Sequence, residues 1–178
     1  MPRPAANGRI AGATTVAIGL GSNMPHGRYG RPRAVLLAAV DALAGRGLQI
    51  LQLSPIIRTA PLGPSRRRYA NAVLKGCWPG DAHALLHCLK EVEKCFGRKS
   101  GRRWGARVLD CDLLAFGNAI IHSRQLQVPH PRLQDRDFVL QPMAAVWPQW
   151  RHPGLRLTVR QMRAQLHKPK LNQPSAVD

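Results

Sequence analysis

Short apolar runs of strand length alternate with two amphipathic helical stretches over the first two thirds of this chain. Asp81 is suited to cap the start of the second stretch, and Gly45 and Gly97 are suited to end the two helices. The expected elements, in chain order, are a strand at 15–20, a helix at 33–44, strands at 48–57 and 69–78, a helix at 81–96 and a strand at 108–116. This mixed order predicts an α+β fold with helices packed on a largely antiparallel sheet.

Length and composition indicate one folded domain. The chain has 178 residues, of which 44% are hydrophobic and 20% charged, as in ordinary globular proteins. Residues 1–13 and 167–178 lack hydrophobic periodicity and are rich in Pro, Ala, Lys and Asn, so we expect flexible tails there. The folded domain is therefore expected at 14–166.

A large positive charge is the strongest compositional signal. The chain carries 27 Lys and Arg residues against 9 Asp and Glu residues, a formal net charge of +18, which attracts polyanions such as nucleotides and nucleic acids. A basic surface without a specific partner is the simpler alternative. Aromatic residues make up only 5%, too few for a typical sheet that binds RNA by stacking, so nucleic-acid binding is kept only as a second hypothesis.

The four cysteines predict neither a zinc site nor a disulfide framework. Cys77, Cys88, Cys95 and Cys111 form no Cys-x-x-Cys pair, and none has a histidine at zinc-finger spacing. Residues 1–15 lack the continuous apolar core of a secretion signal, and no apolar stretch reaches membrane-spanning length. We therefore expect a cytoplasmic protein without a membrane partner.

Two aspartates interrupt the last apolar run. Asp110 and Asp112 flank Cys111, and the period of two in a strand places both carboxylates on the same face. Like charges so close are costly to bury without a cation, and Mg²⁺ binds a few carboxylates together with phosphate oxygens and water. Arg103 and Arg107 precede the pair and could bind phosphate. The alternative is a solvent-facing strand edge whose aspartates form salt bridges with these arginines.

Six motifs resemble, in the same order, the motifs of the hydroxymethyldihydropterin pyrophosphokinase family. Together they span about 15–153, nearly the whole expected domain. They are Gly-Leu-Gly-Ser-Asn at 19–23, Thr-Ala-Pro-Leu-Gly-Pro at 59–64, Tyr-Ala-Asn-Ala-Val at 69–73, Gly-Arg at 97–98 with Arg-Trp-Gly-Ala-Arg-Val-Leu-Asp-Cys-Asp-Leu-Leu at 103–114, Val-Pro-His-Pro-Arg at 128–132, and Arg-Asp-Phe-Val-Leu-Gln-Pro at 136–142.

The resemblance implies a ferredoxin-like fold in which ATP and 6-hydroxymethyl-7,8-dihydropterin meet in one cleft. The implied reaction is Mg²⁺-dependent transfer of pyrophosphate from ATP to the hydroxymethyl group of the pterin, with AMP as the leaving group, in folate biosynthesis. Two Mg²⁺ ions and a monomeric enzyme are expected. Catalysis would rest on positioning and electrostatics, and we identify no general base.

The resemblance also implies which residues contact the pterin. Tyr69 and Phe138 would stack on the two faces of the ring, although each could equally be an ordinary core residue. Asn71 would pair with the amide-like edge of the ring, together with Thr59 and the backbone near Leu62. The expected pterin-binding residues are Thr59, Leu62, Tyr69, Asn71, Asp110 and Phe138.

The nucleotide and metal sites follow in the same way. The expected ATP-binding residues are Glu93, Arg98, Trp104, Arg107, Leu113, His130 and Arg136, with Arg98 and Trp104 in a mobile loop. Asp110 and Asp112 are the expected metal ligands. The expected catalytic residues are these two aspartates with Arg98, Arg107 and Arg136, whose charges would neutralise the transferred phosphates.

Four positions depart from the family pattern, and one of them is Ala60, which replaces a frequent proline in the loop at the pterin edge. Ala106 stands where a proline is usual, Val108 where a threonine is usual, and Lys90 where we expect a glutamine that contacts ATP. None of them removes a metal ligand or an aromatic ring, so we expect an active enzyme. The alternative is a diverged paralogue with a different substrate.

Overall fold

A five-stranded antiparallel sheet is the centre of the fold in the computed structural model, which describes residues 12–60, 67–97 and 107–168. The strands are β1 (Thr14–Ser22), β2 (Gln49–Leu53), β3 (Ile57–Thr59), β4 (Tyr69–Trp78) and β5 (Asp110–Phe116). Their order is β2-β4-β1-β5, and β3 pairs with the start of β4. The expected α+β class with a mostly antiparallel sheet is confirmed.

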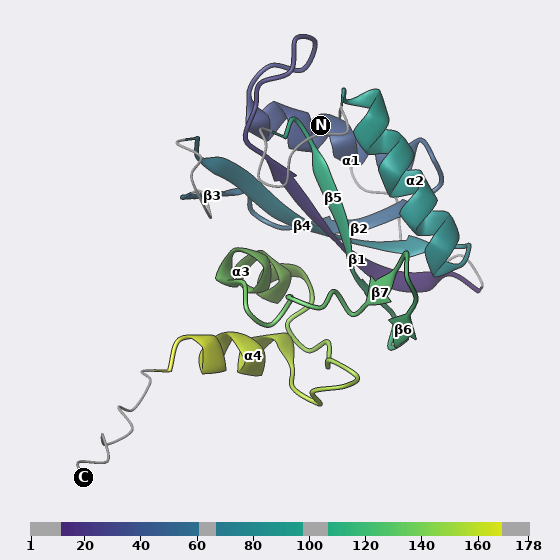
Figure 1. Cartoon of the computed structure of the whole chain (residues 1–178), viewed down its shortest axis with the longest axis vertical. Helices are drawn as coiled ribbons and strands as arrows, with labels where there is room; N and C mark the ends of the chain where they lie inside the picture. The colour runs from purple at the N-terminus through teal and green to yellow at the C-terminus, as the bar shows by residue number, and fades with distance from the viewer. Residues whose placement is uncertain (1–11, 61–66, 98–106, 169–178) are drawn as a thin grey trace.

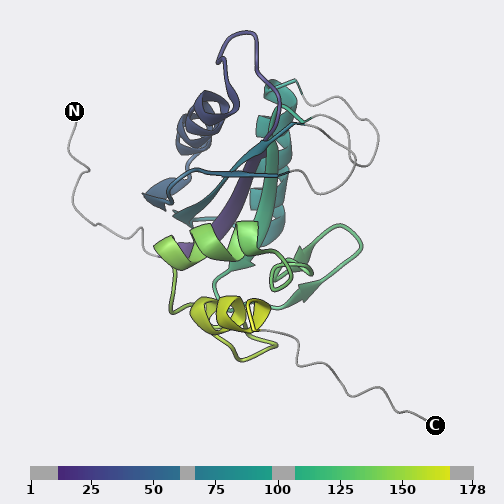
Figure 2. The ribbon, with the colours of Figure 1, turned by 90° about the vertical axis from the view of Figure 1, so that its left-hand side faces the viewer.

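Helices cover both faces of this sheet (Figure 1). They are α1 (Pro32–Ala44) and α2 (Ala82–Cys95) on one face, and α3 (Asp137–Val146) and α4 (Val159–Leu166) on the other. Figure 2, turned by 90°, shows α3 next to the sheet and α4 beyond it. Each face therefore has its own apolar core.

The alternation of side chains along β1 supplies both cores. Val16, Ile18 and Leu20 join the core under α1 and α2, whereas Ala17 joins the core under α3 and α4. All four side chains are buried, with at most 2% exposed. The sheet is consequently a central layer, and any site on it must open at an edge or between strands and a helix.

The ends of α2 agree with the sequence prediction. The Asp81 carboxylate accepts a hydrogen bond from the Ala84 N–H at 2.7 Å, which satisfies one of the free donors of the first turn. Gly97 has a φ of 77°, a left-handed conformation that glycine adopts without strain, and it ends the helix.

The prediction of a single strand at 48–57 is wrong. The structure has two strands in this region, β2 and β3, with a break between them. Ser54 lies between β2 and β3, and its hydroxyl accepts the Val73 N–H at 2.9 Å where a backbone carbonyl would be expected. Pro55 has no N–H to continue the ladder. The chain therefore bends here, and β3 pairs separately with β4.

The sequence analysis predicts no element after 116, where the structure has a hairpin, β6 (Ile121–His122) with β7 (Gln127–Val128), followed by α3 and α4. Pro142 lies inside α3, and proline in a helix is normally read as a break. None of the helices in the described part of the chain combines the length and apolar character that crossing a membrane requires. Residues 1–11 and 169–178 of the predicted tails lie outside the described residues.

Candidate active site

A cavity of about 440 Å³ lies between the sheet and the segment that leads into α3, a volume typical of small-molecule sites. It brings together most of the predicted site residues from strands, loops and a helix that are far apart in the sequence. These are Thr59, Tyr69, Asn71, Arg107, Asp110, Asp112, His130, Arg136 and Phe138. Leu62, Arg98 and Trp104, also predicted, lie outside the described residues, as does Ala106.

Side chains along β5 alternate between this cavity and the opposite core. Asp110, Asp112 and Leu114 line the cavity, while Cys111 and Leu113 pack in the core under α1 and α2. The prediction that both carboxylates share one face is therefore confirmed. The Leu113 side chain does not line the cavity, and its expected contact with ATP stays a prediction.

Arg107 is held at the mouth of β5 by its backbone and its side chain. Its guanidinium Nη1 donates to Asp110 Oδ1 at 2.7 Å. Its N–H donates to Asn23 Oδ1 at 2.8 Å, and its carbonyl accepts the Asn23 N–H at 3.1 Å. The sequence analysis missed the role of Asn23, for which the only signal was its place in the Gly-Ser-Asn turn after the first strand.

Asp112 is electrostatically the most costly of these groups. Burial raises the pKa of its carboxyl above the usual range, and the neighbouring charge of Asp110 raises it further, against the lowering effects of His130, Lys90 and Arg136. Burial also lowers the pKa of His130, although the charge of Asp112 opposes this. A cation between the two aspartates would lower the free-energy cost of keeping Asp112 ionised.

The donor set fits a metal ion that arrives with a phosphate ligand. Within residues 12–60, 67–97 and 107–168, no cluster of three or more His, Cys, Asp or Glu side chains could hold an ion by itself. Two carboxylates leave most of the six positions around Mg²⁺ for phosphate oxygens and water, which is the arrangement that this ion prefers. The pair therefore fits Mg²⁺ bound to a nucleotide better than a permanent structural metal.

The cost of the Asp112 charge predicts that Asp112→Asn stabilises the metal-free protein. The folded-state pKa lies above the unfolded value, so the ionised carboxylate destabilises the fold above that pKa, and this effect disappears as the pH falls below the unfolded pKa. We expect thermal unfolding in EDTA at pH 7.5 to show a Tm higher in the variant by about 2–4 °C, the shift that ~1 kcal/mol gives in a domain of this size. The difference should shrink at pH 4. An unchanged or lower Tm at pH 7.5 would contradict the assignment.

A polar edge of the cavity is built by the pairing of β3 with β4. Thr59 lies opposite Tyr69 in the register, and the Asn71 Nδ2 donates to Thr59 Oγ1 at 2.8 Å. Gly21 on β1 lies against this edge, where a Cβ atom would be 3.4 Å from Asn71 Oδ1 and 3.8 Å from the Asp110 Cβ. A larger residue at Gly21 would crowd both side chains, a constraint that the sequence analysis did not identify.

The opposite wall comes from the start of α3. The Arg136 guanidinium lies over the Phe138 ring, with 5.7 Å between its Cζ atom and the ring centroid. Arg136 Nε is buried and has no hydrogen-bond partner among the described residues. Buried donors are nearly always paired, so this N–H indicates a missing acceptor, and a phosphate oxygen is the acceptor that a guanidinium prefers.

Glu93 of α2 contacts β5, the strand that carries Asp110 and Asp112, on the face opposite the cavity. Its carboxylate is 1% exposed, accepts the Cys111 N–H at 2.8 Å and pairs with Lys90 Nζ at 3.1 Å. Cys111 is the residue between the two aspartates, so this contact fixes the backbone from which both carboxylates project. Glu93 does not line the cavity, and its expected contact with ATP stays a prediction. Lys90, which departs from the family pattern, is the ion-pair partner of Glu93.

Comparison with known proteins decides the family. A model of the 7,8-dihydro-6-hydroxymethylpterin-pyrophosphokinase (HPPK) family matches residues 17–148. The chain belongs to this family. The 2-amino-4-hydroxy-6-hydroxymethyldihydropteridine pyrophosphokinase of Aquifex aeolicus is 33% identical over 150 residues, which cover 84% of this chain and 90% of the relative. The protein of the same name from Pseudomonas aeruginosa is 36% identical over 143 residues, covering 78% and 83%.

The HPPK fold is confirmed by solved structures as well. The Plasmodium falciparum HPPK-DHPS structure superposes with a TM-score of 0.66 at 13% identity, covering 86% of this chain. This chain spans 44% of that longer protein. The ferredoxin-like fold and the reaction class of the family, ATP-dependent pyrophosphoryl transfer to hydroxymethyldihydropterin in folate biosynthesis, therefore agree with the motif-based prediction.

Proposed function

We propose that the cavity between β5 and α3 is the place where this HPPK-family chain transfers pyrophosphate from ATP to 6-hydroxymethyl-7,8-dihydropterin. One observation carries the proposal: two same-face carboxylates share a single cavity with the side chains of Arg107 and Arg136 and with two aromatic side chains beside an amide. A metal-nucleotide site and a flat heteroaromatic site are thereby adjacent, as a direct transfer between the two ligands requires.

The nucleotide half is assigned to the charged side chains. Asp110 and Asp112 would hold Mg²⁺, two ions in the ternary complex, and the metal would supply positive charge against the phosphates of ATP. Arg107 and Arg136 would bind the phosphates, with Arg136 Nε gaining the acceptor that it lacks. Arg98 belongs to the same proposal, outside the described residues.

His130 is assigned as a neutral hydrogen-bond donor to the nucleotide. Its Nδ1 accepts the Arg132 N–H at 3.2 Å, which places the ring proton on Nε2 in the neutral tautomer. Burial lowers the pKa of this imidazole, so the neutral form is favoured at physiological pH. A donor N–H without a positive charge fits a ribose or phosphate oxygen beside the arginines.

The pterin half is assigned to the uncharged residues. Tyr69 and Phe138 would stack on the ring, and Asn71, held by Thr59, would offer a carbonyl oxygen and its second amide N–H to the ring edge. The pterin hydroxymethyl oxygen would then bond to the β-phosphorus of ATP as the bond from that phosphorus to the AMP oxygen breaks, and the hydroxyl proton would pass to solvent. The chain contributes alignment, positive charge and exclusion of water.

Removing one stacking ring should weaken the binding of the pterin without weakening the binding of ATP. We expect Tyr69→Ala to weaken pterin binding about 10- to 30-fold, the loss of one buried aromatic contact, and to change ATP binding by less than about twofold. Tyr69→Phe is the matched control, because it keeps the ring and loses only the hydroxyl. Pterin fluorescence titration and calorimetry with ATP measure the two affinities. Equal losses for both ligands in Tyr69→Ala would mean that Tyr69 is structural.

The products of the reaction test the function as a whole. Purified protein with ATP, Mg²⁺ and 6-hydroxymethyl-7,8-dihydropterin should form AMP, and omission of the pterin or of Mg²⁺ should abolish it. Formation of ADP would place the attack on the wrong phosphorus. Pterin binding without AMP would indicate a diverged paralogue, whereas a salt-steep affinity for RNA without ATP use would support the nucleic-acid hypothesis. The monomeric state and the cytoplasmic compartment stay predictions.

A further inference from the structure

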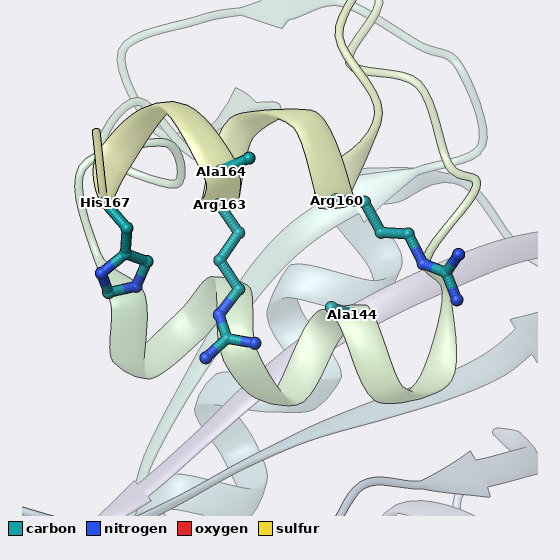
Figure 3. A pocket seen from close by; sticks show the side chains of 5 residues that line it. All are labelled: Ala144, Arg160, Arg163, Ala164 and His167. Atoms are coloured by element: carbon teal, nitrogen blue, oxygen red, sulfur yellow. The ribbon is translucent and has the colours of Figure 1, made fainter.

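Arg163 of α4 and His167, the residue that follows this helix, contact the first residue of α3 from outside the cavity. Arg163 Nε lies 3.0 Å from Asp137 Oδ1, and His167 Nε2 lies 2.8 Å from the same atom. Figure 3 shows Arg163 and His167 pointing towards α3, with Arg160 farther along α4. These residues line a pocket of about 350 Å³. Nothing in the proposed reaction uses this cluster.

Asp137 stands between two residues that do line the cavity. Its neighbours are Arg136, with the unpartnered Nε, and Phe138, whose ring lies under the Arg136 guanidinium. Burial raises the pKa of Asp137, but hydrogen bonds from His167 and Arg163 outweigh it, so the pKa lies below its usual value and the carboxylate is charged at neutral pH. Three consecutive residues thus connect α4 to the proposed phosphate and pterin contacts.

The Arg136 carbonyl accepts the Val139 and Leu140 N–H groups in the first turn of α3, but two other constraints of a regular helix start are missing there. Arg136 is the N-cap residue and makes no side-chain capping hydrogen bond. Pro142 has no N–H, so the Phe138 carbonyl lacks the hydrogen bond that a residue four positions later normally donates. An anchor on Asp137 therefore matters more than in a regular helix, where these bonds would hold the turn.

Helix α4, in contrast, is firmly fixed. Val159 and Met162 are buried in the core that it shares with α3, with 0% and 2% exposed. Thr158 and Gln161 form a reciprocal capping box at its start, with hydrogen bonds of 3.2 and 2.9 Å. The helix can therefore serve as a rigid support for the side chains that reach Asp137.

We infer that Arg163 and His167 are positioning residues, which act through Asp137 to hold Arg136 and Phe138 in the orientation that binds phosphate and pterin. The inference rests on the proposed function of the cavity. Neither side chain lines the cavity, so their loss should weaken alignment rather than remove a contact with a substrate. A misplacement of about 1 Å at a reacting group can cost up to roughly 100-fold in rate, so even a modest loosening of this turn is measurable.

The test compares the loss of the two side chains that contact Asp137 with the loss of another basic side chain of α4. Arg163→Gln combined with His167→Gln should lower kcat/KM for AMP formation about tenfold and weaken pterin binding about fivefold, because both Arg136 and Phe138 lose their support. Arg160→Gln makes the same charge change as Arg163→Gln on the same helix, and the structure shows no contact between Arg160 and Asp137 among the described residues. This control should stay within about twofold of the parent.

Two further experiments distinguish a positioning role from a general loss of stability: rescue of activity by a conservative variant, and non-additive effects of substitutions at Asp137 and Arg163. Arg163→Lys keeps a cation near Asp137 and should recover most of the kcat/KM lost in Arg163→Gln, and Asp137→Asn with Arg163→Gln together should cost little more than either alone. All assays run well below each variant's Tm. Equal behaviour of the Arg163/His167 and Arg160 variants would overturn the inference. A parent protein without pterin-dependent AMP would instead refute the proposed function, and the two failures are thereby distinguishable.

Discussion

Asp112→Asn is expected to lower kcat for AMP formation by about 10²- to 10³-fold or more, because one of two metal-binding carboxylates is lost from a site whose catalysis is electrostatic. The substitution keeps the shape of the side chain and, by removing a costly charge, should leave the fold at least as stable. Initial rates at saturating ATP and pterin, over a range of Mg²⁺ concentrations, measure the effect.

The control for this variant is Asp41→Asn. Asp41 is an exposed residue of α1, and its loss changes the net charge of this basic protein by the same amount. Its activity should match the parent within about twofold. Turnover of Asp112→Asn near the parent rate, at any Mg²⁺ concentration, would refute the assignment of Asp112 to the metal.

Glu93→Ala is expected to produce the largest loss of stability, about 2–4 kcal/mol in the free energy of unfolding. The substitution leaves the buried Cys111 N–H without its acceptor and opens a cavity between α2 and β5. Urea unfolding measures the loss. Transfer should fall as well, at temperatures where the variant is still folded, because the backbone between the two metal-binding aspartates loses its fixed point.

Two matched substitutions identify the contact that matters. Glu93→Gln keeps an oxygen that can accept the Cys111 N–H, so it should cost clearly less than Glu93→Ala. Lys90→Gln removes the ion pair and a long hydrogen bond of 3.5 Å from Lys90 Nζ to the Cys111 carbonyl but keeps the Glu93 contact with the Cys111 N–H, and because Lys90 is 42% exposed, we expect a loss below about 1 kcal/mol. A loss for Lys90→Gln as large as that for Glu93→Ala would assign the stability to the ion pair instead of the strand contact.

Local patterns predicted the parts of the fold that local physics determines. The two-residue period placed Asp110 and Asp112 on one face of β5, and Asp81 and Gly97 marked the ends of α2, because strand alternation and helix capping depend on neighbours in the chain. The strand expected at 48–57 is interrupted at Ser54 in the structure. There the Ser54 hydroxyl, instead of a backbone carbonyl, accepts a hydrogen bond of the ladder, and the sequence pattern does not reveal this.

Contacts between distant elements account for what the sequence did not predict. Helix α3 contains Pro142, a local signal against a helix that burial in the core overrides. The family resemblance predicts that Glu93 contacts ATP, but only the structure reveals that its carboxylate accepts the backbone N–H of Cys111 in β5. The contact of Asn23 with Arg107 joins residues far apart in the chain, and only the folded arrangement of β1 beside β5 reveals it.

A crystal structure of the ternary complex with a non-hydrolysable ATP analogue, Mg²⁺ and 6-hydroxymethyl-7,8-dihydropterin would test the central claim most directly. The account predicts metal ions within about 2.1 Å of carboxylate oxygens of Asp110 and Asp112, with phosphate oxygens completing their coordination. It also predicts the pterin ring between Tyr69 and Phe138, and Arg107 turned from Asp110 to the phosphates. Ligands bound elsewhere, or Asp110 still paired with Arg107 and no metal on Asp112, would contradict it.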